Sequence, residues 1–143
     1  MRTIKFRGKD HITGNWYYGS LFVNEIYGKT HIWASTLGYF DIDPETVGQF
    51  TGLYDCDGKE IYEGDILDFN GLKIEVRFVR GVFALLCNGD LDNELCGDCR
   101  TDMFAKVIGN IHDNPELLKG GEKCSKCPNS GIGGHLRFSQ ILT

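Results

Sequence analysis

Alternation of apolar and polar residues runs through much of this chain and predicts β-strands. The stretch 3–7 alternates over its whole length. Stretches rich in aromatic and β-branched residues follow at 16–24 and 30–35. Gly19 lies inside the first of these, and a glycine within a strand is typical of a bulge or of a close backbone approach. The first third of the chain is therefore expected to be a small β-element.

The clearest single pattern lies between residues 65 and 79. Asn70 and Gly71 separate two alternating apolar runs, which favours a type I′ hairpin turn because that turn needs positive φ at both central residues. The apolar residues of the return strand share one face. The charged residues share the other face: Lys73, Glu75 and Arg77. We therefore expect a hairpin with one buried face and one solvated face.

Further strands and connections complete the pattern. Additional strands are predicted at 47–53, 61–69, 82–86 and 103–111. Two polar stretches, 36–46 and 88–102, are expected to be irregular, with Pro44 fixing a bend in the first. A short helical turn is predicted near 114–118, opened by Asn114-Pro115 and ended by Gly120-Gly121.

The predicted fold class is mainly β. Five short antiparallel strands between about 45 and 111 favour a small SH3-like barrel, because short twisted strands curl and closure removes exposed edges. A smaller β-element precedes this barrel. The predicted domains are an N-terminal β-element at 1–44, a barrel domain at 45–119 and a tail rich in glycine and cysteine at 120–143.

Composition narrows the class of protein. The chain has 143 residues, 19 of them glycines, which fits one turn-rich domain with a small appendage. Its net charge of -5 disfavours a protein that coats nucleic acid. The start lacks the apolar core of a secretory signal, and the longest apolar run, "VFALLC", is too short for a membrane helix. We therefore expect a cytoplasmic protein, with no membrane contact and with reduced cysteines.

The stretch "YDCDGKE" (54–60) raises the question of a cation site. If Gly58 were the sixth position of a calcium loop, the first position would be Leu53 and the twelfth Gly64, so two required ligands are missing. Asp and Gly also make good tight turns, because Asp bonds its own backbone and Gly accepts positive φ. The sequence predicts a turn.

Two C-x-x-C pairs are candidate metal ligands. They are Cys96 with Cys99 and Cys124 with Cys127. The gap of 24 residues between the pairs is slightly longer than the roughly 15–20 residues typical of zinc sites. Four thiolates can close a tetrahedral structural zinc site. The alternative is that these are reduced surface cysteines, and both interpretations remain open.

No catalytic constellation is evident in the sequence. The four histidines stand in no nucleophile elbow, and His112-Asp113 fits a pair that caps a loop. Two groups could serve binding. The cations Lys73, Arg77 and Arg80 follow one strand, and aromatic residues gather at Trp16, Tyr17, Tyr18 and Trp33. The plainer interpretations are a solvated strand face and a small aromatic core.

Five segments occur in an order that resembles a known family. They are "IKFRGK", "GNWYYGSL", "VGQFTGLYDCDGKEIYEGDIL", "EVRFVRGVFAL" and "VIGNIHDNPELL". Over residues 2–119 the chain is similar to the YopX family of phage and prophage proteins. The resemblance implies a mostly β fold with a C-terminal SH3-like barrel, and it implies no catalytic or metal-binding residue. The tail after Gly120 lies outside the resemblance.

These observations favour two functions. The first is an accessory protein of a phage or prophage, a non-enzymatic module that binds a protein partner or a second copy of itself. The alternative is a nucleic-acid-associated protein with a structural zinc held by Cys96, Cys99, Cys124 and Cys127. A small enzyme is a third interpretation, and no group of residues in the sequence supports it.

Overall fold

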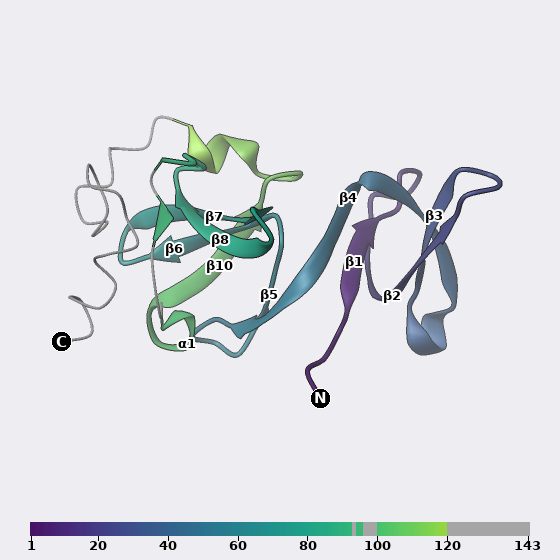
Figure 1. Ribbon diagram of the computed structural model, residues 1–143, viewed down its shortest axis with the longest axis horizontal. Coiled ribbons are helices and arrows are strands. Elements are labelled where there is room, and N and C mark those ends of the chain that lie inside the picture. The colour runs from purple at the N-terminus through teal and green to yellow at the C-terminus, as the bar shows by residue number, and fades with distance from the viewer. Residues whose placement is uncertain (93, 96–99, 120–143) are drawn as a thin grey trace. The chain divides into compact units, whose positions relative to one another are not determined.

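The computed structural model describes residues 1–92, 94–95 and 100–119. The chain divides into two compact units, Met1–Gly52 and Leu53–Thr143. Figure 1 shows antiparallel strands as the main element of both. The mainly β fold class predicted from the sequence is therefore confirmed. None of the helices in the described ranges is long and apolar enough to cross a membrane.

The first unit is a ring of four paired strands. In chain order these are β1 (Phe6–Lys9), β2 (Trp16–Asn24), β3 (Lys29–Trp33) and β4 (Tyr39–Tyr54), with a short 3-10 helix, η1 (Ser35–Leu37), before β4. Each strand pairs with the next in antiparallel fashion, and β1 also pairs with β4. This last pairing closes the ring, so the N-terminal β-element is itself barrel-like.

A small apolar core fills this ring. Ile32, Ala34 and Ile42 are buried there, and partly buried side chains pack around them: Phe6, Tyr17, Leu21, Phe40 and Val47. Tyr17 and Phe40 stack almost parallel, with ring centroids 3.7 Å apart. Gly19 lies at the point where β2 changes partner from β1 to β3. A Cβ there would collide with the carbonyl oxygen of Trp33, so the predicted close backbone approach is confirmed.

The stretch 36–46 is more regular than predicted. Only its first part is irregular, and β4 begins at Tyr39. The register of β4 against β1 shifts between the pairs Arg7–Gly48 and Lys9–Asp43. Pro44 lies inside this shift, where a strand tolerates a residue that has no backbone N–H. The proline therefore sits in a bulge within a strand, and the sequence prediction of a break was wrong for residues 39–46.

The second unit contains a five-stranded antiparallel sheet in the order β10-β6-β7-β8-β9. Its strands are β6 (Asp65–Phe69), β7 (Leu72–Val79), β8 (Val82–Cys87), β9 (Glu94–Leu95) and β10 (Ala105–Asn110). A short strand, β5 (Glu60–Tyr62), precedes them and pairs with the end of β4. Among the described residues no pairing joins β9 to β10, so this counterpart of the predicted SH3-like barrel is open.

The core of the second unit is larger than that of the first. Its buried members come from β5, β6, β7, β8 and β10: Ile61, Leu67, Ile74, Val76, Leu85, Cys87 and Ala105. Asn70 and Gly71 both have positive φ, 53° and 90°, which confirms the predicted hairpin turn between β6 and β7. The predicted helical turn is also present, as the 3-10 helix η2 (Pro115–Leu118).

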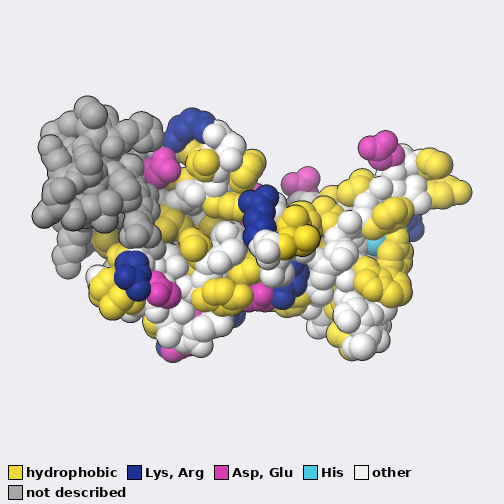
Figure 2. All heavy atoms as spheres, turned by 60° about the horizontal axis from the view of Figure 1, so that its bottom comes forward, with side chains coloured by type: hydrophobic (Ala, Val, Ile, Leu, Met, Phe, Trp, Pro, Cys, Tyr) yellow, Lys and Arg dark blue, Asp and Glu magenta, His cyan; other side chains and the backbone are white. Residues whose placement is uncertain are grey.

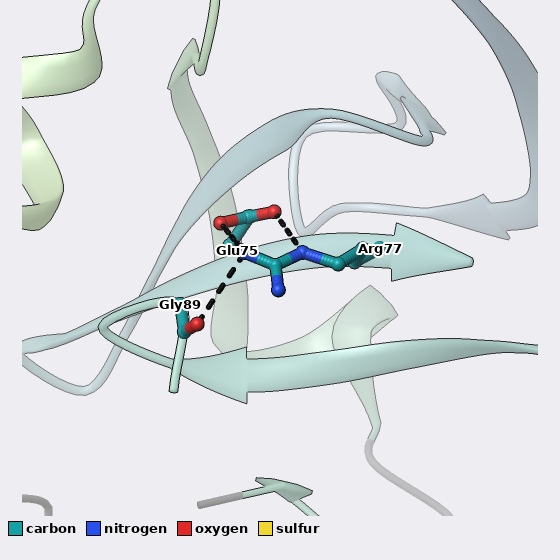
Figure 3. A network of polar contacts seen from close by, with 3 residues as sticks. All are labelled: Glu75, Arg77 and Gly89. Carbon is teal, nitrogen blue, oxygen red and sulfur yellow. Dashed lines mark hydrogen bonds and ion pairs between the residues drawn. The ribbon is translucent and has the colours of Figure 1, made fainter. Parts of the chain in front are cut away.

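Two predictions for this unit were wrong. The last strand was expected to begin at residue 103, but a short helix, α1 (Thr101–Phe104), occupies its first positions. The charged face of β7 was expected to be solvated, but Glu75 is only 4% exposed because η2 packs against this strand. Figure 3 shows how the buried carboxylate is satisfied, since Arg77 reaches it with two nitrogens at 2.7 and 2.8 Å.

Candidate functional site

The acidic loop at 54–60 is a turn held by the side chain of Asp55. This side chain is buried, and one of its oxygens, Oδ1, accepts hydrogen bonds from the backbone N–H groups of Asp57 and Lys59, at 2.9 and 2.8 Å. The other oxygen, Oδ2, accepts the N–H of Val107 at 3.0 Å. The predicted turn is therefore confirmed, and the same carboxylate ties the turn to β10.

The electrostatics of Asp55 agree with this structural role. Burial by itself raises the pKa of the carboxyl, but the backbone N–H groups of Val107, Lys59 and Asp57 outweigh it and hold the pKa below its ordinary value of 3.8. The folded structure is thus stabilised by the ionised form of the Asp55 carboxyl. The second acidic side chain, Asp57, points outward and lies 3.8 Å from the Nζ of Lys106.

The three cations of the β7 region each contact a carboxylate of the same chain. Lys73 lies 3.3 Å from Asp68, and Arg80 lies 3.1 Å from Glu94. Arg77 is engaged by Glu75, and its Nη2 also donates to the carbonyl oxygen of Gly89 at 3.3 Å. Cations compensated in this way attract a phosphate backbone less than free cations do. The solvated strand face considered from the sequence therefore carries little net positive charge.

The predicted zinc ligands lie outside the described residues. Cys96, Cys99, Cys124 and Cys127 all belong to the undescribed segments, so the zinc site stays a prediction. Within residues 1–92, 94–95 and 100–119, no three His, Cys, Asp or Glu residues come together as a metal site would require. Cys56 is an exposed free cysteine on the acidic turn. Cys87 on β8 is disulfide-bonded, so the expectation of reduced cysteines is wrong for this residue.

The His112-Asp113 dipeptide lies in a turn after β10. The backbone N–H groups of both residues donate to Oδ1 of Asn110, at 3.0 and 2.9 Å, and the Asn110 amide donates to Asp113 at 3.2 Å. Asn110 is therefore the residue that caps this turn. The sequence identified the loop correctly but assigned the capping role to its neighbours.

The outer face of the first unit's sheet carries a group of aromatic rings. Phe22 on β2, His31 and Trp33 on β3, and Tyr39 on β4 share this face, because the strand register pairs Phe22 with His31 and Trp33 with Tyr39. We call these four residues the aromatic face. Phe22, Trp33 and Tyr39 are 50%, 52% and 48% exposed. Figure 2 shows hydrophobic side chains gathered over this part of the molecule.

Tyr39 lies at the centre of the aromatic face. Its ring stacks on His31 at 4.6 Å and meets Phe22 and Trp33 at centroid distances of 6.2 and 6.0 Å. These distances are typical of favourable ring pairs. The four rings of the face therefore pack against one another.

The border of the aromatic face is electrically balanced. Lys29 and Asp41 lie 3.6 Å apart on neighbouring strands, and the Nδ1 of His31 lies 3.9 Å from the same aspartate. The His31 side chain is only 15% exposed, and no hydrogen-bond partner for its Nδ1 is present in the described part of the chain. The face therefore presents apolar rings with a compensated charge at one border.

The aromatic residues singled out from the sequence are divided by the sheet. Tyr17 stacks in the core, whereas Trp33 lies on the outer face. Trp16 lies beneath the guanidinium of Arg7, 4.8 Å from its ring centroid. Sequence proximity was a misleading guide, because neighbours in a strand point to opposite faces. Alternation along β3 groups His31 with Trp33, but only the register between strands adds Phe22 and Tyr39.

Comparison with known proteins agrees with this architecture. The sequence pattern of the family described as YopX protein matches residues 5–119. The chain belongs to the YopX protein family. The match spans both units and ends after η2.

A solved structure supports the same fold. The crystal structure of protein EF1440 from Enterococcus faecalis is similar at a TM-score of 0.58 and 25% sequence identity, and the match covers 83% of this chain and 100% of that one. None of the curated proteins matches the chain. YopX family membership and this likeness therefore establish family and fold, while the function has to be argued from the surface.

Proposed function

We propose that this YopX family protein is a non-enzymatic binding module of a phage or prophage, and that its aromatic face takes up a protein partner. One observation carries the proposal: three large rings, each about half exposed, lie together on the sheet face that points away from the core. Large apolar rings gathered on a surface are typical of interaction sites. Aromatic side chains supply much of the energy of protein interfaces.

The charge around the aromatic face favours a protein partner over nucleic acid. Single-stranded nucleic acid also stacks on aromatic rings, but its phosphates require uncompensated cations nearby. The cation at the border, Lys29, is compensated by Asp41. The strand cations of the second unit are likewise close to carboxylates, and the whole chain carries a net charge of -5.

Two buried carboxylates of the second unit serve the fold. Asp55 accepts three backbone N–H groups, and Glu75 is buried against Arg77. A catalytic carboxylate has to reach a substrate, whereas the acceptor positions of these two are turned toward the protein's own donors. This arrangement favours a binding function over an enzymatic one.

Affinity capture with matched variants tests the proposal. The tagged protein is expressed in host cells that carry the phage and captured with and without nuclease. We expect a nuclease-resistant protein partner that is lost with the double variant Trp33→Ser, Tyr39→Ser. The control is Phe78→Ser, since Phe78 is 50% exposed on β7 and lies outside the aromatic face.

Two results would overturn the proposal. One is a partner that both variants retain equally, because the aromatic face would then make no contribution to binding. The other is a partner lost on nuclease treatment, which would favour the nucleic-acid alternative. Circular dichroism of each variant confirms that a loss of binding does not arise from unfolding.

A further inference from the structure

The second half of β2 has one unpaired edge. β1 pairs only with Trp16–Gly19, and β3 pairs only with Ser20–Asn24. Among the described residues, no strand pairs with the side of Ser20–Asn24 that faces away from β3. An unpaired edge presents a row of backbone donors and acceptors that can accept another strand.

Apolar side chains flank this edge on both faces of the sheet. Phe22 points to the aromatic face and is 50% exposed, while Val23 points to the opposite face and is 54% exposed. Val23 shares its side with the core residues Leu21 and Ile32 but lies at the border of that core. A strand added here would cover both side chains in addition to satisfying the backbone.

The edge also lacks the features that normally prevent strand addition. Natural edge strands are protected by lysines, by other charges, by proline or by bulges. Residues 20–24 read Ser-Leu-Phe-Val-Asn, with no charge and no proline, and their pairing with β3 runs without a shift in register. Such an edge is complementary to another apolar and uncharged strand.

We propose that the edge of β2 at Ser20–Asn24 pairs with the same edge of a second copy of this chain. A two-fold axis perpendicular to the sheet makes the two strands antiparallel and uses the same residues on both sides. Because these residues are uncharged, self-pairing brings no like charges together. The pairing makes the sheet continuous from β2, β3 and β4 of one copy into the same strands of the other.

This dimer goes beyond the proposed function, since its contact is made by the β2 backbone, Val23 and, of the aromatic face, Phe22 at its edge. The rings of Trp33 and Tyr39 lie on the strands farther from this edge. Because the axis keeps each face on its own side, the two aromatic faces become continuous. A dimer therefore offers a partner two adjacent sites, which raises avidity without any new contact in either site.

Sedimentation equilibrium over a concentration series tests the dimer. We expect wild type to approach twice the 16.1 kDa mass of one chain as concentration rises. The variant Val23→Lys sets two lysines near each other across the axis and should raise the dissociation constant roughly a hundredfold or more. The matched control is Val82→Lys, because Val82 is 55% exposed on β8 of the other unit and should leave the dimer unchanged.

Amide hydrogen exchange on wild type gives a second readout that needs no variant. Protection of the amides in Leu21–Asn24 should rise with protein concentration, whereas that of the β7 amides should not. A mass of one chain at every concentration up to about 1 mM would overturn the inference, because an affinity that weak supports no assembly. Equal effects of Val23→Lys and Val82→Lys would also overturn it.

The dimer proposal and the binding proposal for the aromatic face can be refuted separately. Trp33→Ser, Tyr39→Ser should leave the sedimentation result of wild type unchanged, whereas Val23→Lys should leave the rings of the aromatic face intact. A dimer that survives Val23→Lys and dissociates with the double variant would place the contact on the rings and overturn the edge pairing. If the captured partner is lost with the double variant and retained with Val23→Lys, the result agrees with both proposals.

Discussion

At the scale of single residues, Asp55 is a buried polar group that stabilises the second unit. Its carboxylate joins the turn at 54–60 to β10 through three backbone hydrogen bonds. Asp55→Asn keeps the shape but replaces one acceptor oxygen by a donor, so at least one buried N–H loses its partner. We expect a loss of about 2 kcal/mol in the free energy of unfolding, measured by urea denaturation.

The neighbouring aspartate supplies the control. Asp57 is exposed and its contact with Lys106 is long, 3.8 Å, so Asp57→Asn should change the unfolding free energy by less than about 0.5 kcal/mol. Equal losses for the two variants would mean that the acidic turn acts through its overall charge. The hydrogen bonds of Asp55 would then not be the cause.

The pH dependence of stability follows from the same carboxylate. Because the pKa of Asp55 is lower in the folded state than its ordinary value of 3.8, its contribution is fully present above that value. It is lost as the pH falls through the folded-state pKa. The difference in unfolding free energy between wild type and Asp55→Asn should therefore be constant from pH 7 to about pH 5 and shrink below about pH 4. A difference that does not shrink would contradict this account.

At the scale of elements, β7 and η2 enclose the buried carboxylate of an ion pair. Arg77 provides the two hydrogen bonds that satisfy Glu75, whose side chain is 5% exposed. Arg77→Ala leaves a buried carboxylate without its cation, and we expect a loss of about 2 kcal/mol in unfolding free energy. Lys73→Ala on the same strand removes an exposed pair with Asp68 and should cost less than about 1 kcal/mol.

Thermal and urea unfolding of the two variants check this contrast. Similar losses for Arg77→Ala and Lys73→Ala would show that burial of Glu75 carries no penalty. The packing also restricts Gly89, since a Cβ there would lie 2.8 Å from Oε1 of Glu75. The loop after β8 is thereby held against the ion pair.

Strand positions and turns were predictable because they depend on neighbouring residues. The span of β2 was predicted as 16–24, and the turn at Asn70-Gly71 follows from the φ values that only such residues adopt easily. Burial of Glu75 was not predictable, because the covering element η2 lies about forty residues further along the chain. The aromatic face was missed for a related reason, since its members come from three strands brought into register by long-range pairing.

At the scale of the whole chain, the four cysteines proposed as zinc ligands form two pairs that lie far apart in the sequence. We expect about one zinc per chain by elemental analysis of protein purified without chelator, if Cys96, Cys99, Cys124 and Cys127 form one tetrahedral site. Cys99→Ser removes one of four thiolates and should lower the zinc content severalfold, because a structural site needs all of its ligands.

A Cys56 variant distinguishes zinc held at this site from metal bound by any accessible thiol. Cys56 is an exposed free cysteine of the same chain, and Cys56→Ser should leave the zinc content unchanged. Equal losses for Cys56→Ser and Cys99→Ser would indicate adventitious metal on surface thiols. Protein that contains no metal after this purification would instead remove the four-cysteine site, and the nucleic-acid alternative would then lose the zinc-stabilised end on which it was built.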